Sequence, residues 1–197
     1  MHRGSLIAAF LLMAPCATAQ VPYYGTLGIY DDPEHTQPFG SMLPGFKTIY
    51  IGVDLDSPPW ATDLLGLEFS VAGLDPFFLL GMDVQPATPY AIGDIHAPVD
   101  SSTGTGGINI GWDWLIPDSS VSIALHLVGG APPADHVLRV LRRFPPTSLE
   151  HPFPLAYFDS GLVFIRMPLI GRSYTLNPTI AVESGTWSAV KSLFRGS

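Results

Sequence analysis

The chain has 197 residues, a formal net charge of −8 and no run of basic residues. This excess of acidic side chains argues against nucleic acids and anionic membrane surfaces as partners, because both bind through clustered Lys and Arg. Charged residues make up only 13% of the sequence, while glycine and proline number 20 each. Helical proteins rarely tolerate helix-breaking residues at this density, so the composition favours many short strands joined by turns.

The N-terminus has the pattern of a secretory signal peptide. A short basic start at His2 and Arg3 precedes an apolar run at 6–14, and the small residues Ala17 and Ala19 form the usual cleavage pattern. The apolar run is too short to span a bilayer, which needs about 20 residues. We therefore expect export, cleavage after Ala19 (removing residues 1–19) and no membrane span in the mature chain.

Cysteine usage points the same way. Cys16 is the one cysteine, and it lies within the expected signal peptide. The mature chain then has no disulfide, no thiolate nucleophile and no cysteine-bound metal. It must fold on a hydrophobic core alone, and its length suits one domain. We expect that domain at 20–180 and a distinct C-terminal tail at 181–197.

Apolar and polar residues alternate with period two along most of the mature chain. In 64–71, for example, Leu67 and Phe69 share one face of a strand, and Glu68 and Ser70 lie on the other. The predicted strands are 24–30, 47–55, 64–71, 78–84, 108–114, 120–128, 137–144, 162–167 and 173–176. Eight or nine strands separated by turn residues predict an all-β protein, an antiparallel β-sandwich of immunoglobulin-like, cohesin-like or jelly-roll type.

Two segments are less regular. The segment 137–144 could also form a helix, but its short length and the Pro145–Pro146 pair that follows favour a strand. The segment 142–157 is rich in proline, and we expect it to cross the surface in an extended conformation.

The tail has a different period. Thr186 can cap a short helix, in which Trp187, Val190 and Phe194 form one apolar stripe at i, i+3 and i+7. A helix of this length is marginal by itself in water. We therefore expect the stripe to dock on the sandwich or on a partner.

An acid-rich stretch at 28–40 has two interpretations. Its side chains that could bind a metal are Asp31, Asp32, Glu34 and His35. An acidic residue before Pro33 is typical of a turn, where its carboxylate bonds the backbone. A metal site, with calcium as the first choice, would need further ligands from other strands, and no metal-binding spacing supplies them.

Trp112 and Trp114 are the candidate ligand-binding residues. They lie two positions apart, so they share one face of a strand. Two exposed rings in this arrangement could stack on sugar rings. The alternative is that both rings fill the core while Asp113 faces solvent.

Four stretches carry a resemblance to known proteins: "YGTLGIYDDPEHTQ", "FKTIYIGVD", "LLGLEFSVAG" and the ending Trp187, Val190, Lys191, Leu193, Phe194 and Arg195. They resemble a set of exported bacterial proteins with no assigned activity, whose chains end in Trp-x-x-[IV]-Lys-x-[LM]-[YF]-Arg. The middle strands are also similar to those of cohesin-type and carbohydrate-binding sandwiches. The resemblance implies a sandwich and export, and no catalytic residue. Members often carry a cysteine pair that this chain lacks.

These patterns predict an exported, non-catalytic sandwich that acts by surface contact, in adhesion, scaffold assembly or glycan binding. The expected location is the cell envelope or the extracellular space, and the expected partner is an envelope protein or a polysaccharide. The alternative is a secreted hydrolase, metal-dependent, that uses the region of Asp31, Asp32, Glu34 and His35. We expect no cofactor other than calcium in that region.

Overall fold

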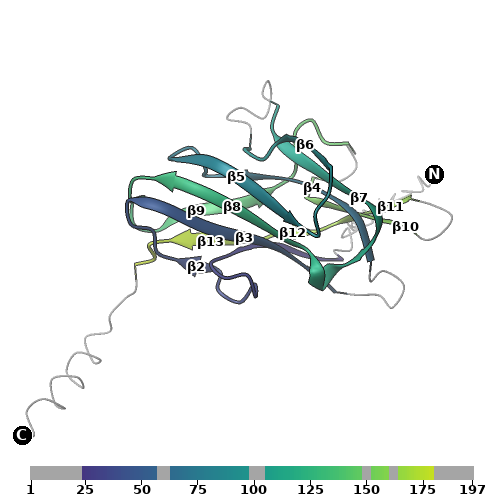
Figure 1. The fold of residues 1–197 in the computed structure, drawn as a ribbon, viewed down its shortest axis with the longest axis horizontal. Helices are drawn as coiled ribbons and strands as arrows, with labels where there is room; N and C mark the ends of the chain where they lie inside the picture. Colours follow the sequence, from purple (N-terminus) through teal and green to yellow (C-terminus); the bar gives the residue numbers. More distant parts are fainter. Residues whose placement is uncertain (1–23, 57–62, 98–104, 148–151, 160–163, 180–197) are drawn as a thin grey trace, which may run out of the picture.

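The computed structural model describes residues 24–56, 63–97, 105–147, 152–159 and 164–179 (Figure 1). These residues form thirteen strands and one short 3-10 turn, η1 (Asp118–Ser120), with no α-helix among them. The strands make two sheets, which confirms the predicted β-sandwich. The expected signal peptide and the Trp187, Val190 and Phe194 stripe lie outside the described residues.

The first sheet has five strands in the order β12-β1-β3-β8-β5. Their bounds are β12 (Ile170–Gly171), β1 (Gly25–Tyr30), β3 (Gly45–Leu55), β8 (Ser122–Gly129) and β5 (Phe77–Gln85). β1 pairs with β12 in parallel, and the other neighbours pair antiparallel.

The second sheet has eight strands and is organised around β4 (Asp63–Ala72). Along one edge β4 pairs with β7, which in turn pairs with β6. Along its other edge β4 pairs first with β10 and then with β9. β10 continues to β11, and β9 continues through β13 to β2. The bounds are β7 (Gly107–Pro117), β6 (Tyr90–Asp94), β10 (Leu155–Asp159), β11 (Phe164–Pro168), β9 (His136–Leu141), β13 (Ser173–Leu176) and β2 (Phe39–Gly40).

The core lies between the two sheets and is built from the apolar faces of the alternating strands. Leu67 and Phe69 of β4 are fully buried there, as their spacing predicts, and Ile49 and Ile51 of β3 are buried in the same cluster. Burying each such side chain stabilises the fold by about 1.5–3 kcal/mol relative to exposure.

The structure corrects the expectation for 142–157. Its last residues are not a surface crossing, because 155–157 belong to β10, which pairs with both β4 and β11. Leu155, Ala156 and Phe158 are all buried, so the strand shows no period-two pattern. β6 was missed for the opposite reason, since all five of its residues are exposed. The short strands β2 and β12 were missed as well, and the ambiguous segment 137–144 contains β9.

The polar face of β4 is covered as well. Glu68 is 1% exposed and Ser70 is fully buried. The Ser70 hydroxyl donates a hydrogen bond to the carbonyl of Arg142 at 2.8 Å. Residues 142–147 therefore lie against the outer face of this sheet and are held there by the polar side chains of β4.

Replacing Phe69 with alanine should lower the free energy of unfolding by about 3–5 kcal/mol, because it leaves a cavity at the centre of the core. Ser70→Ala, one residue along, should cost only about 1 kcal/mol, the typical worth of one hydrogen bond. Urea unfolding of both variants measures the difference. Equal losses would contradict the assignment of Phe69 to the inner face.

Candidate functional site

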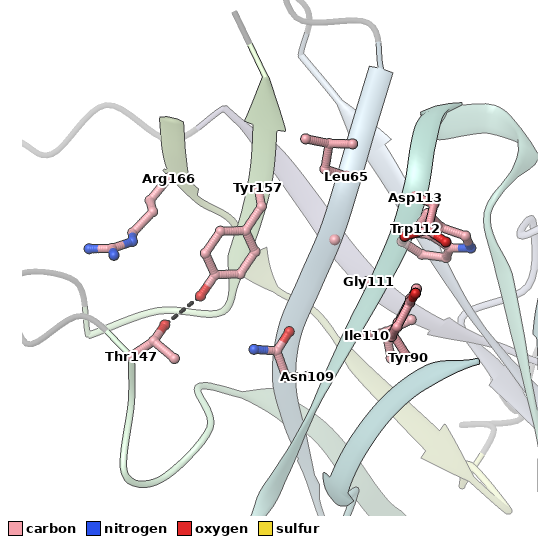
Figure 2. A pocket seen from close by; sticks show the side chains of 11 residues that line it. Leu65, Tyr90, Asn109, Ile110, Gly111, Trp112, Asp113, Thr147, Tyr157 and Arg166 are labelled. Carbon is pink, nitrogen blue, oxygen red and sulfur yellow. Dashed lines mark hydrogen bonds between the residues drawn. The ribbon is translucent and has the colours of Figure 1, made fainter. Parts of the chain in front are cut away.

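A groove of about 730 Å³ lies on the outer face of the second sheet (Figure 2). It runs across five neighbouring strands, β11, β10, β4, β7 and β6. The residues that line it are Leu65, Gly66, Tyr90, Asn109, Ile110, Gly111, Trp112, Asp113, Thr147, Tyr157 and Arg166.

One row of cross-strand partners forms the floor and the walls of this groove. In register across the sheet the row runs Arg166, Tyr157, Gly66, Gly111 and Tyr90. Neighbouring strands lie about 4.8 Å apart, so the two tyrosines stand three spacings, or ~14 Å, from each other. Since glycine has no side chain, the two glycines leave an open floor between two aromatic walls.

Packing requires glycine at one of these two positions and not at the other. A β-carbon on Gly66 would lie 2.7 Å from the carbonyl oxygen of Ile110, so the close approach of β4 and β7 requires glycine there. A β-carbon on Gly111 would meet its nearest atoms at 3.7 and 3.8 Å, which is ordinary contact. Packing therefore leaves room for a side chain at 111, and its absence keeps the groove open.

The Tyr157 wall is held from behind by Glu68 and Thr147. The Tyr157 hydroxyl donates to Glu68 Oε2 at 2.8 Å, and the Thr147 hydroxyl donates to the same oxygen at 2.6 Å. The Thr147 amide donates to Glu68 Oε1 at 3.0 Å. Figure 2 shows the further contact between the Tyr157 and Thr147 hydroxyls. Both oxygens of this buried carboxylate are thus satisfied, so Glu68 positions the wall of the groove.

Burial raises the pKa of Tyr157 to about 12, and the Glu68 carboxylate acts in the same direction. The phenol is therefore neutral at physiological pH and committed to Glu68. Its contribution to the groove is an aromatic surface held in place, which suits stacking better than proton transfer.

The positive and the negative side chain of the groove lie at its opposite sides. Arg166 lies at the β11 side, Asp113 at the β7 side and Asn109 between them, as Figure 2 shows. Among the described lining residues Asp113 is the one carboxylate, and none is His, Cys or Ser. Glycosidases ordinarily need a pair of carboxyl groups at the scissile bond. The described lining thus presents aromatic surfaces and hydrogen-bonding groups.

The two tryptophans considered as a ligand platform differ in burial. Trp112 is 5% exposed, belongs to the core and donates its indole N–H to the carbonyl of Pro86 at 2.8 Å. Trp114 is 52% exposed. The two rings thus do not form one exposed platform. The pairing of β7 with β4 is irregular at this point, with Gly66 paired to Gly111 and Leu64 to Ile116.

The aromatic walls of the groove are Tyr90 and Tyr157, which sequence reasoning did not single out. They lie on β6 and β10, two strands that the period-two pattern missed. Their convergence depends on the pairing register of four strands, and no local spacing in the sequence encodes that register.

In the acid-rich turn, the Asp32 carboxylate forms hydrogen bonds with groups of the turn itself. Asp32 accepts hydrogen bonds from the Thr36 hydroxyl at 2.6 Å and from the amides of Thr36 and Gln37 at 3.0 and 2.8 Å. The bond from the Thr36 hydroxyl lowers the pKa of Asp32. This is the turn interpretation of the sequence, in which an Asp side chain replaces backbone partners.

The other metal candidates of this turn do not gather around one point. Asp31 forms an ion pair with Lys47 and accepts a hydrogen bond from the Tyr174 hydroxyl, whereas Glu34 is exposed. Within the residues that the structure describes, no three His, Cys, Asp or Glu side chains converge as metal ligands would. The calcium hypothesis thus lacks a third ligand in this part of the chain.

His35 closes the turn over the first sheet. Its backbone is left-handed, with φ of 59°, and its ring lies on Gly52, where an added β-carbon would come within 2.3 Å of His35 Nδ1. Its Nε2 lies 3.2 Å from the Ser122 hydroxyl, and the Tyr30 ring is 5.2 Å away. Burial lowers the pKa of His35.

A depressed pKa means that the folded state prefers neutral His35. Its contribution to stability is therefore present above the unfolded pKa of about 6.5 and is lost as the pH falls. The melting temperature should fall more between about pH 7.5 and pH 5 for the wild type than for His35→Asn, because Asn tolerates the left-handed backbone and does not titrate. Calorimetry at the two pH values tests this, and an identical pH dependence would contradict it.

No protein-family model matches this sequence, and a comparison with curated protein sequences gives no match. A cohesin module of a family 33 glycoside hydrolase from Clostridium perfringens is similar in structure, with a TM-score of 0.48, 12% identity, and coverage of 80% of this chain and all of that module.

Two further cohesins are similar at the same level. The seventh ScaB type I cohesin from Pseudobacteroides cellulosolvens has a TM-score of 0.45 and 10% identity, covering 82% of this chain and 97% of its own. The sixth cohesin of scaffoldin B from Acetivibrio cellulolyticus, solved with a dockerin, has a TM-score of 0.42 and 12% identity, covering 79% and 99%. At these TM-scores the likeness carries no inference about fold family, ligand or activity.

The described part of the chain contains no helix that is long and apolar enough to cross a membrane.

Proposed function

We propose that this protein is a non-catalytic binding module, and that the groove across its second sheet binds an extended glycan chain. The observation that carries the proposal is the row in which two glycines separate Tyr157 from Tyr90. The row is an open floor bounded by two aromatic side chains, on the face of a sheet.

The chemistry of the groove fits sugars. The C–H faces of a sugar ring stack on aromatic side chains, and its hydroxyls bond to planar polar groups such as those of Asn109, Asp113 and Arg166. The aromatic walls stand ~14 Å apart, which is more than the width of one sugar ring. A chain of several units therefore uses both walls, whereas a monosaccharide reaches only one.

The groove is also formed before any ligand arrives. Its floor and both walls stand on paired strands, and Tyr157 is braced by Glu68 and Thr147. Sites on strands hold their side chains more precisely than sites on loops. A ligand then loses little free energy to ordering of the protein, so a modest set of contacts gives useful affinity.

Blocking the floor tests the proposal. Gly111→Val should abolish binding, because the side chain fills the space between the two tyrosines, while β-branched residues suit a strand and leave the fold intact. Gly81→Val is the matched control, because Gly81 lies in the first sheet, away from the groove. An added β-carbon there meets only the His126 ring, at 4.0 Å. The measurement is binding of both variants and of the wild type to a panel of immobilised cell-wall polysaccharides, with melting curves as the check on folding.

The expected result is that the wild type and Gly81→Val retain at least one polysaccharide, which folded Gly111→Val fails to retain. Failure of the wild type to bind any polysaccharide would overturn the proposal. So would retention by Gly111→Val equal to that of its control.

A polysaccharide partner requires that the protein leaves the cytoplasm, and we propose export through the segment 1–19. N-terminal sequencing of the processed protein should begin at Gln20, because Ala17 and Ala19 form the cleavage pattern. A chain that still carries the apolar run 6–14, or a lipid on Cys16, would exclude this route of processing.

A further inference from the structure

The groove has a direction because its charges are unequal at its two sides. Arg166 follows Tyr157 in the cross-strand row and is exposed on β11, which lies at the edge of the described sheet. Asp113 lies across the glycine floor, on β7. Figure 2 shows the guanidinium of Arg166 on the far side of the Tyr157 ring from Gly111.

Arg166 forms no ion pair with any other residue that the structure describes. The ion pairs among the described residues are Lys47–Asp31, His96–Asp94 and His126–Asp83. The Glu68 carboxylate, which bonds the Tyr157 hydroxyl, is buried, and both of its oxygens already accept bonds from Thr147 and Tyr157. The guanidinium, with its five N–H donors, thus lies beyond Tyr157 at the end of the groove, without a carboxylate partner in this part of the chain.

A cation in this position is informative because the protein as a whole is acidic. With 17 acidic against 9 basic residues, the chain repels anionic polymers in general. An anionic ligand therefore needs a local cation, and a planar carboxylate matches the fork of an arginine in a bidentate pair. Asp113 repels a second anion at the opposite side and accepts hydrogen bonds from sugar hydroxyls.

We infer that the groove selects an acidic polysaccharide, a chain containing uronic acid units, with one carboxylate bound by Arg166 and a neutral face of the chain toward Asp113. This inference rests on the proposed function, since it names the class of glycan that the same groove takes. Tyr157 then stacks on the sugar whose carboxylate, or whose neighbour's carboxylate, reaches Arg166.

The test uses pairs of polymers with the same backbone, of which one member carries carboxylates and the other does not. The full-length protein is titrated with polygalacturonate and with its methyl ester, and with glucuronate-substituted xylan and unsubstituted xylan, in a calorimeter. The acidic member of at least one pair should bind about ten- to hundredfold more tightly, the range expected for hydrogen bonds to a charged group. Added salt should weaken that preference, because it screens an exposed ion pair.

Variants separate the role of Arg166 from general charge. Arg166→Ala should remove the preference for the acidic polymer and leave binding of the neutral one, while Arg166→Lys should keep part of it, since lysine retains the charge and loses the fork. Arg139→Ala is the matched control, because Arg139 is also exposed on a strand but lies outside the groove lining. A sulfated glucan, which carries sulfate esters and no carboxylates, serves as a third probe for an anion of different shape.

Equal binding of acidic and neutral members, or an unchanged preference in Arg166→Ala, overturns the inference and leaves the proposed function standing. Tighter binding of the sulfated glucan than of the carboxylated chains overturns the choice of a carboxylate. If no member of any pair binds, the inference is overturned, and the polysaccharide panel described above decides whether the proposed function fails with it.

Discussion

The structure depends on β4, a strand that is buried on both faces and paired along both edges. Its inner face supplies Leu67 and Phe69 to the core, whereas its outer face carries the polar Glu68 and Ser70. A buried polar group is costly unless it is bonded. The two outer side chains therefore hold the segment from Arg142 to Thr147 against the sheet, and the same carboxylate fixes one wall of the groove.

A comparable link joins the acid-rich turn to the rest of the molecule. Asp31 connects Lys47 of the first sheet with Tyr174 of the second, whose ring is fully buried. Asp32 shapes the turn itself, and His35 covers the first sheet beside it. The most chemically suggestive residues in the sequence are thus structural in the described part of the chain. The groove is built by residues that attract little notice individually.

Alternation of apolar residues predicted the sandwich and the strands that face solvent on one side and the core on the other. It failed for β10, where Leu155, Ala156 and Phe158 are all buried, and for β6, where every residue is exposed. Period-two alternation arises only in a strand with one solvent-exposed face and one buried face. The groove could not be predicted, since its walls come from these two strands and its floor from glycines whose pairing is a matter of register.

The groove exists because two side chains are missing, and this has an evolutionary consequence. A binding site made from loops changes its preference when a whole loop is rebuilt. Here each of five strands presents one residue per row to the groove, and the backbone beneath is held by pairing that does not depend on the identity of most of those residues. Single substitutions at Gly111, Tyr90 or Arg166 can therefore alter the shape and charge of the groove while the scaffold stays constant. The lining of the groove can thus change by point substitutions on an otherwise fixed surface.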